Sequence, residues 1–233
     1  IQNLRERTDD DYIYSNYGYE EDEIILVESA EMDSNTEFKK LTNYVTNNDI
    51  TQNAIYDNVC NMMDMENFMD YFMTEIYLRN TDWPHNNIKA WKKKEGGRWR
   101  WILYDTDFGY NIWSNDHTHN TLTWALGEQS GSNPANAQWS TILLRRLVLN
   151  DTFRKSFIDK FCIHMSSTFE ATRANAILDS LAAKIATEIV YHKNKWGSAR
   201  TLTNDVSIMK GFSANRPNSM MNFIGSRFLS NPG

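Results

Sequence analysis

A few polar residues in the middle of the chain could take part in the same chemistry. Asp82 is followed five residues later by Asn87, and residues 105–109 read Asp-Thr-Asp-Phe-Gly. Mg²⁺ prefers oxygen ligands and takes few of them from protein, because water and phosphate oxygens complete its coordination. Asn87, Asp107 and Asp105 could therefore hold a divalent cation, which leaves Asp82 as a base.

A β-hairpin over residues 87–104 is expected to bring these groups together. Aromatic and β-branched residues occur in its first and last parts, and a polar segment containing the glycines 96–97 separates these two parts. This is the pattern of two strands joined by a tight turn. A turn centred on the glycines would place residues 86–87 opposite residues 106–107, with facing side chains roughly 5 Å apart. Because Asp82 enters from the preceding loop, we expect a hard-cation site at the open end.

The order of these pieces is more specific than any one of them. Asp and Asn at this spacing usually form turns and caps, whereas Asp-Phe-Gly at the far end of a hairpin that begins at the Asn is a rarer combination. Protein kinases have the same layout: a catalytic-loop Asp, an Asn five residues later that holds a metal, a hairpin, and Asp-Phe-Gly.

Residues 80–87 and 99–109 resemble the signature of the spore-coat protein H (CotH) family of atypical protein kinases. Residues 4–7 with 11–13, and Phe212 with the pair 216–217, are also similar to stretches of that family, so the likeness spans nearly the whole chain. The resemblance implies a mainly α (α+β) fold. It would be the large lobe of a protein kinase with a short β-hairpin at the active site, and with the small N-terminal lobe missing or nearly so.

Roles for individual residues follow from the resemblance. It implies that Asp82 accepts the proton of a substrate hydroxyl, and that Asn87 and Asp107 hold the divalent ions, Mg²⁺ or Mn²⁺, that bridge the phosphates of ATP. Asp105 would be a further metal ligand. Leu4 to Glu6 would form the strand and hinge that contact adenine, and serine in a protein would be the phosphorylated residue.

Two departures from ordinary kinases stand out. Residues 80–81 replace the His-Arg that usually precedes the catalytic Asp. No Gly-x-Gly-x-x-Gly occurs, and no Lys precedes Lys39, so a phosphate-covering loop and its lysine would lie upstream of Ile1. We therefore expect this fragment alone to bind Mg-ATP weakly and to phosphorylate little, and the longer parent to do both.

The surrounding pattern predicts one domain over 1–233, with a hinge remnant at 1–8 and a helical part at 139–229. Asp64 is expected to cap a helix whose apolar stripe includes Phe68, Phe72 and Ile76. Because Pro84 disfavours helix, residues 82–87 are expected to form a loop after this helix. Helices are further expected at 36–45, 52–62, 139–149, from Asp151, at 171–192 and after Pro217, with 24–27 as a strand or a helix start and 111–138 irregular.

Composition excludes some classes of function. The 233 residues carry a net charge of −6, which argues against a nucleic-acid partner because phosphate binding depends on clustered Lys and Arg. No apolar run approaches the roughly 20 residues of a membrane span. An acidic chain suits a basic, serine-containing protein substrate. Oligomeric state and compartment stay undetermined, although the resemblance favours the cell envelope or extracellular surface.

Two other functions remain open. A pseudokinase or surface adhesin would keep the fold and use its tryptophans and its polar loop to bind a protein or glycan, and loss of Asp82 would then leave function unchanged. Alternatively, residues 105–107 could be the metal-binding Asp-x-Asp of a glycosyltransferase. That reading needs a nucleotide-binding domain of alternating strands and helices, and the sequence lacks this alternation.

Overall fold

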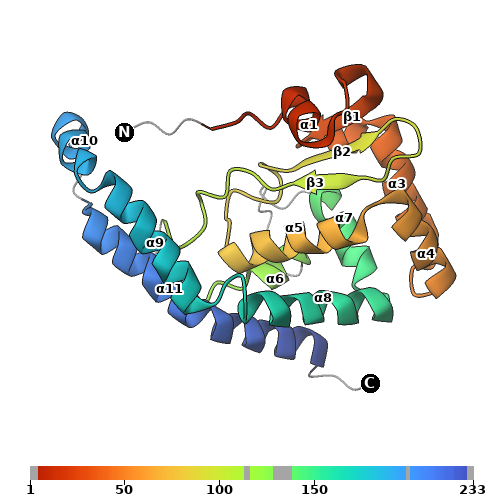
Figure 1. Cartoon of the computed structure of the whole chain (residues 1–233). Coiled ribbons are helices and arrows are strands. Elements are labelled where there is room, and N and C mark those ends of the chain that lie inside the picture. Colours follow the sequence, from red (N-terminus) through yellow and green to blue (C-terminus); the bar gives the residue numbers. More distant parts are fainter. Residues whose placement is uncertain (1–4, 113–115, 128–137, 198–199, 230–233) are drawn as a thin grey trace.

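The computed structural model describes residues 5–112, 116–127, 138–197 and 200–229 (Figure 1). Helices predominate, and the strands form an antiparallel sheet of order β1-β2-β3, which confirms the mainly α class with a small β component. The elements are α1 (Asp10–Tyr17), β1 (Ile24–Glu28), α2 (Glu31–Ser34), α3 (Thr36–Asn47), α4 (Asn53–Met62), α5 (Met65–Leu78), β2 (Lys89–Lys93), β3 (Arg100–Ile102), α6 (Thr121–Ala125), α7 (Gln138–Leu147), α8 (Asp151–Met165), α9 (Ala171–Ile185), α10 (Glu188–Trp196) and α11 (Leu202–Ile224), with short turns of helix at Glu21–Glu23 and Gly225–Leu229.

Helix α5 lies at the centre of the molecule (Figure 1) and leads directly into the loop that carries Asp82. As predicted, Asp64 caps it, accepting a hydrogen bond from the backbone N–H of Asn67 at 3.2 Å. The helix ends at Arg79, which adopts left-handed backbone angles. On its buried face Phe68 meets Trp101 of β3 edge-on, with ring centroids 4.8 Å apart. Helix α5 is thereby fixed against the sheet.

The sheet lies between α1 and α5 (Figure 1). Strand β1 pairs with β2 from Ile24 opposite Lys93 to Glu28 opposite Lys89, so the segment 24–27 that could have begun a helix is a strand. Ile13 of α1 packs into a small cluster with Ile24 and other apolar side chains of the sheet. The larger core, around α5, contains most of the buried aromatic residues.

The predicted hairpin is present, but its register is two residues away from the expected one. Lys89 faces Ile102, whereas a turn centred on the glycines 96–97 would have placed Lys89 opposite Tyr104. The chain turns at residues 94–96 instead, with Gly96 at φ 66°. Because side chains alternate with period two, this shift preserves which residues share a face. The ladder ends at Lys89, so residues 86–87 and 106–107 lie beyond the paired strands.

The C-terminal helices differ from expectation at their ends. Helix α8 is capped by Asn150, not by Asp151: the Asn150 side chain accepts from the N–H of Phe153 at 3.1 Å. The predicted helix over 171–192 is divided into α9 and α10 at residues 186–187, where the backbone angles stay helical. Within 111–138, expected to be irregular, α6 forms over residues 121–125.

The last predicted helix starts earlier than expected. Pro217 lies inside α11, which begins at Leu202. Proline in a helix interior costs roughly 3 kcal/mol because it removes a donor and crowds the preceding turn. The neighbouring Arg216 offsets this cost, since its fully buried guanidinium donates hydrogen bonds to backbone carbonyls at the end of α5 and in the segment before α6. The proline is thus tolerated where tertiary contacts hold the helix.

The predicted hinge is only partly visible. Leu4 lies outside the described residues, and Glu6 is exposed in a stretch, residues 5–8, that belongs to no strand. The expected strand at residues 4–6 is therefore wrong for its described part. Among the described helices, none combines the length and the apolar character that a bilayer crossing requires.

Candidate functional site

Asp82 lies in the loop between α5 and β2, with its carboxylate held by two neighbouring amides. The Asn86 side chain donates to one carboxylate oxygen at 3.1 Å, and the Asn87 side chain donates to the other at 3.0 Å. The backbone N–H of Asp82 donates to the side-chain oxygen of Asn80 at 3.1 Å. Both the backbone and the carboxylate of Asp82 are therefore fixed, while the amide oxygen of Asn87 can still act as a ligand.

Helix α5 supports this loop through Tyr71. The Tyr71 hydroxyl donates to the backbone carbonyl of Asn87 at 3.2 Å and accepts from the indole N–H of Trp83 at 3.0 Å. Trp83 is fully buried and precedes Pro84 through a cis peptide bond. One hydroxyl on α5 thus fixes the two ends of the segment between Asp82 and Asn87.

A second support from α5 joins the loop to the segment after β3 that carries Asp105. Asn80 is buried, and its side-chain N–H₂ donates to the carboxyl of Glu75 at 2.9 Å and to the backbone carbonyl of Asp105 at 3.4 Å. Glu75 is completely buried, and burial raises its pKa to about 8, with a further contribution from the charge of Asp105.

The Asp-Thr-Asp-Phe-Gly segment forms a turn against the end of α5. The N–H of Gly109 donates to the carbonyl of Thr106 at 3.0 Å, and the N–H of Tyr110 donates to the carbonyl of Leu78 at 3.0 Å. A Cβ added at Gly109 would lie 2.9 Å from the Leu78 carbonyl oxygen. Only glycine fits this close approach, which is why it follows the acidic residues here.

The acidic side chains of the segment influence one another. Partial burial raises the pKa of the Asp105 carboxyl. The charge of Asp107, which also shares a hydrogen bond with Asp105, raises this pKa further, and so does the charge of Asp82. The positive charge of Arg5 opposes these effects and lowers it. Like charges held together favour a proton or a cation between them.

The arrangement fits a divalent cation such as Mg²⁺. Within the described ranges, no group of three or more His, Cys, Asp or Glu side chains is placed to hold a metal. Mg²⁺ needs fewer protein carboxylates than that, because amide, water and phosphate oxygens complete its shell. Asn87 and Asp105 also have positive φ angles of 55° and 50°, a conformation that costs energy and that Asn and Asp tolerate best.

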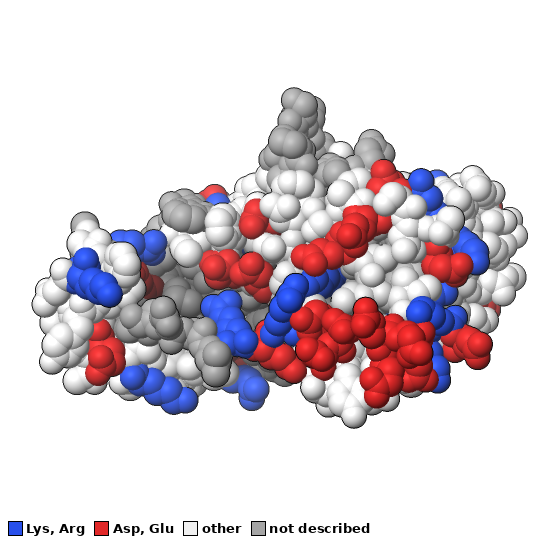
Figure 2. Space-filling model, turned by 90° about the horizontal axis from the view of Figure 1, so that it is seen from above, with Lys and Arg blue, Asp and Glu red and all other residues white. Residues whose placement is uncertain are grey.

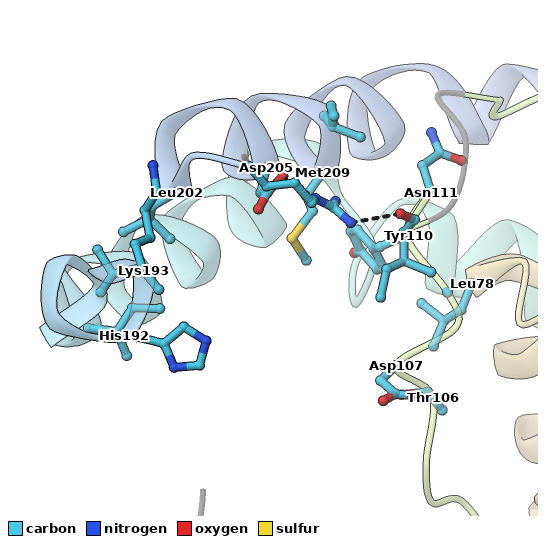
Figure 3. A pocket seen from close by; sticks show the side chains of 16 residues that line it. Leu78, Thr106, Asp107, Tyr110, Asn111, His192, Lys193, Leu202, Asp205 and Met209 are labelled. Atoms are coloured by element: carbon cyan, nitrogen blue, oxygen red, sulfur yellow. Dashed lines mark hydrogen bonds and ion pairs between the residues drawn. The ribbon is translucent and has the colours of Figure 1, made fainter. Parts of the chain in front are cut away.

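A cavity of about 570 Å³ opens beside Asp107. Figure 3 shows it between the turn that carries Asp107 and the arm built from α10 and α11, with the His192 ring projecting into the gap from the opposite side. Its lining is mostly apolar and includes Leu78, Ile112, Ile185, Ile189, Leu202, Ile208 and Met209. A molecule in this cavity would lie next to Asp107.

The structure brings some of the predicted site residues into contact, and their roles stay predictions. Asp82 and Asn87 are in direct contact, and Asp105 shares a hydrogen bond with Asp107 and feels the charge of Asp82. Glu6 is exposed, although the charge of its neighbour Arg5 acts on the Asp105 carboxyl, and Leu4 is not described. Sequence reasoning missed Glu75 and its partner Asn80. The sequence did contain a signal for Glu75: it is a single acidic residue on the apolar face of the predicted helix, one turn after Phe72.

Comparison with known proteins identifies a family. The family model described as CotH kinase protein matches residues 3–220. Neither the curated proteins nor the solved structures include a significant match to the chain. The matched segment contains the loop of Asp82, the hairpin and the acidic turn, together with the helices that support them. The chain therefore belongs to the CotH kinase protein family.

Proposed function

We propose that this chain carries the active site of a protein kinase that transfers the γ-phosphoryl group of ATP to serine in a protein and requires Mg²⁺ or Mn²⁺. The observation that supports this most directly is the contact between Asp82 and Asn87, in a loop tied through Asn80 to the backbone of Asp105. A proton acceptor and a set of hard oxygen ligands are the parts that phosphoryl transfer needs.

Asp82 would act as the proton acceptor. Its carboxylate takes the proton from the serine hydroxyl as the serine oxygen bonds to the γ-phosphorus, and the bond from that phosphorus to the β–γ bridging oxygen breaks to release ADP. The two amide donors on Asp82 fix the rotation of its carboxylate. Little covalent work is asked of the enzyme, because alignment and charge neutralisation supply most of the rate.

Asn87, Asp107 and Asp105 would hold the divalent cation. When bound, such an ion neutralises the charge that develops on the transferring phosphoryl group. Burial raises the pKa of the Asp105 carboxyl, and repulsion from Asp107 raises it further. A bound cation would relieve that repulsion. The cavity beside Asp107 provides space for a substrate next to these ligands.

The protein substrate is proposed to be basic around its serine. Figure 2 shows Asp and Glu side chains gathered over a broad area of the face seen from above, and the whole chain has a net charge of −6. Complementary charge of this kind selects partners and speeds their association.

Transfer of labelled phosphate from ATP tests the proposal. We would compare the full-length protein with its Asp82→Ala and Asp107→Ala variants, in Mg²⁺ and in Mn²⁺, and use Asp159→Ala on the exposed surface of α8 as a matched control. Both site variants should lose at least roughly 100-fold in kcat, and the control should be unchanged. Wild-type transfer in both site variants would rule out the mechanism and favour a binding module.

The 233-residue chain itself provides a second comparison. From the family resemblance we expect it to bind Mg-ATP more weakly, and to transfer less phosphate, than the full-length protein. Equal activity of the two would show that the residues described above suffice for catalysis.

A further inference from the structure

The carboxyl group of Glu75 is an unusual feature of the centre of α5. The residue is completely buried on a helix face whose other members are Phe68, Phe72 and Ile76. Only one of its carboxyl oxygens, Oε2, receives a hydrogen bond, from Asn80; the other has no hydrogen-bond partner among the described residues. A buried polar group with a missing partner costs stability, so packing alone would favour an apolar residue here.

What distinguishes Glu75 is the position of its partner. The Asn80 side chain is an acceptor for the backbone N–H of Asp82 and a donor to the backbone carbonyl of Asp105. The Asn80 amide can make both hydrogen bonds only if its oxygen points to the N–H of Asp82 and its nitrogen points to the carbonyl of Asp105. The carboxyl of Glu75, an acceptor 2.9 Å from that nitrogen, selects this orientation over the flipped one.

The state of Glu75 suits this task. Burial raises its pKa to about 8, and the groups whose charges act on it or respond to it are Asp105, Tyr71 and Tyr104. The acid is therefore largely neutral near pH 7, and a neutral carboxyl still offers its carbonyl oxygen to Asn80. Glutamine has the same shape and the same acceptor, so it should replace Glu75 with little loss.

We propose that Glu75 is a positioning residue for phosphoryl transfer: by accepting a hydrogen bond from Asn80, it holds the amide that fixes the backbone of Asp82 relative to Asp105. Because the Glu75 side chain is completely buried, it would act through Asn80 and not by touching ATP or the substrate hydroxyl. This inference rests on the proposed kinase activity for its catalytic consequence, but the geometry that it describes can be measured without any activity.

Four variants of the full-length protein test the catalytic consequence. Glu75→Gln keeps the acceptor and should retain kcat within about 3-fold. Glu75→Leu and Asn80→Ala should lower kcat by roughly 10- to 100-fold, with a smaller effect on KM, because misplacing a reacting group by about 1 Å has effects of this size. The control is Asn150→Ala, since Asn150 is also buried and also bridges two segments with hydrogen bonds of 2.9 and 3.1 Å, to Ile50 and from Phe153.

Asn150→Ala should lower Tm about as much as Asn80→Ala does and leave kcat unchanged at temperatures where the protein is folded. If Glu75→Gln lost as much kcat as Glu75→Leu, the acceptor role would be refuted. Wild-type kcat in Glu75→Leu would refute it as well.

Amide hydrogen exchange at Asp82 supplies the readout that does not depend on activity. Its N–H, bonded to Asn80, should exchange slowly in the wild type and in Glu75→Gln, and at least about 10-fold faster in Glu75→Leu and Asn80→Ala. Equal protection in all four proteins would overturn the inference even if the enzyme were fully active. Conversely, the expected exchange pattern in a protein that transfers no phosphate would support the positioning role while the proposed function failed.

Discussion

Asp82 accepts hydrogen bonds from the side chains of Asn86 and Asn87, and its backbone N–H donates to Asn80. Asn86 and Asn87 make nearly identical hydrogen bonds to it, at 3.1 and 3.0 Å, yet only Asn87 stands where a metal ligand is expected. The contact between Asp82 and Asn87 could be predicted because the two residues are only five apart in the sequence. The role of Glu75 could not, since it depends on a contact that only the folded helix and loop create.

The two asparagines provide a residue-scale prediction. Asn86→Ala should lower kcat by about 3- to 10-fold through looser orientation of Asp82, with the Mn²⁺ concentration needed for half-maximal activity unchanged. Asn87→Ala should also raise that concentration by at least about 10-fold, because an oxygen ligand is lost. The measurement is activity as a function of Mn²⁺. A melting curve identifies any unfolding, since alanine fits the φ of 55° at residue 87 less well than asparagine does. The same Mn²⁺ dependence in both variants would contradict the assignment of Asn87.

Glu75 provides the second residue-scale prediction, for the pH dependence of stability. Its pKa rises from 4.5 to about 8 on folding, so the folded state binds more protons than the unfolded state between these values, and stability must fall as pH rises through them. Glu75→Gln removes this dependence. The free energy of unfolding of the variant, relative to that of the wild type, should therefore rise by on the order of a few kcal/mol from pH 5 to pH 8. The difference in Tm between the two proteins, measured at each pH, should rise with it. A difference in Tm that did not change with pH would contradict the raised pKa of the buried Glu75 carboxyl.

Among the elements, α5 and α11 together determine where the loop of Asp82 begins. The apolar repeat and the capping Asp64 made α5 predictable in type and nearly in extent. The hairpin was predictable in place, but its register was not, because which residues form the turn depends on the local fit of Gly96 and Gly97. Helix α11 was misjudged because a proline usually ends a helix, and the contacts that overcome this lie about a hundred residues away in the sequence.

An element-scale prediction concerns Arg216. Its guanidinium donates to the carbonyls of Ile76 and Tyr77, the last turn of α5, at 2.8 and 2.9 Å. Arg216→Ala should lower stability by roughly 3–5 kcal/mol, as expected when a buried charged group that makes several hydrogen bonds is lost. Arg173→Ala, on the exposed face of α9, should change it by less than about 0.5 kcal/mol. Chemical denaturation measures both. A small effect of Arg216→Ala would show that α5 is held without α11.

At the scale of the whole molecule, charge is unevenly distributed. Acidic side chains gather on the upper face (Figure 2), where α1 and the sheet lie. The family resemblance implied the mainly helical fold class, and the periodic apolar pattern predicted individual helices. The docking of α10 and α11 as an arm beside the cavity could not be predicted, because the sequence pattern carries no information on how helices dock.

The charge distribution leads to a prediction about substrates. A serine peptide with flanking lysines should have a KM at least about 5-fold lower than the same peptide with flanking glutamates at low salt. The difference should shrink toward 1 at about 0.5 M NaCl, where the Debye length is only a few ångströms. Steady-state kinetics with the two peptides measures this. A preference that is absent at low salt, or that survives high salt, would exclude the acidic face as its cause.

The buried Arg216 also sets an order of events during synthesis. The residue that secures the end of α5 is translated well over a hundred residues after α5 itself, and elements that close such long intervals form late in folding. A nascent chain on the ribosome would thus have Asp82, Asn87 and the acidic turn long before it had the support that aligns them. Catalytic competence would arrive only after α11 had been made and had docked on α5.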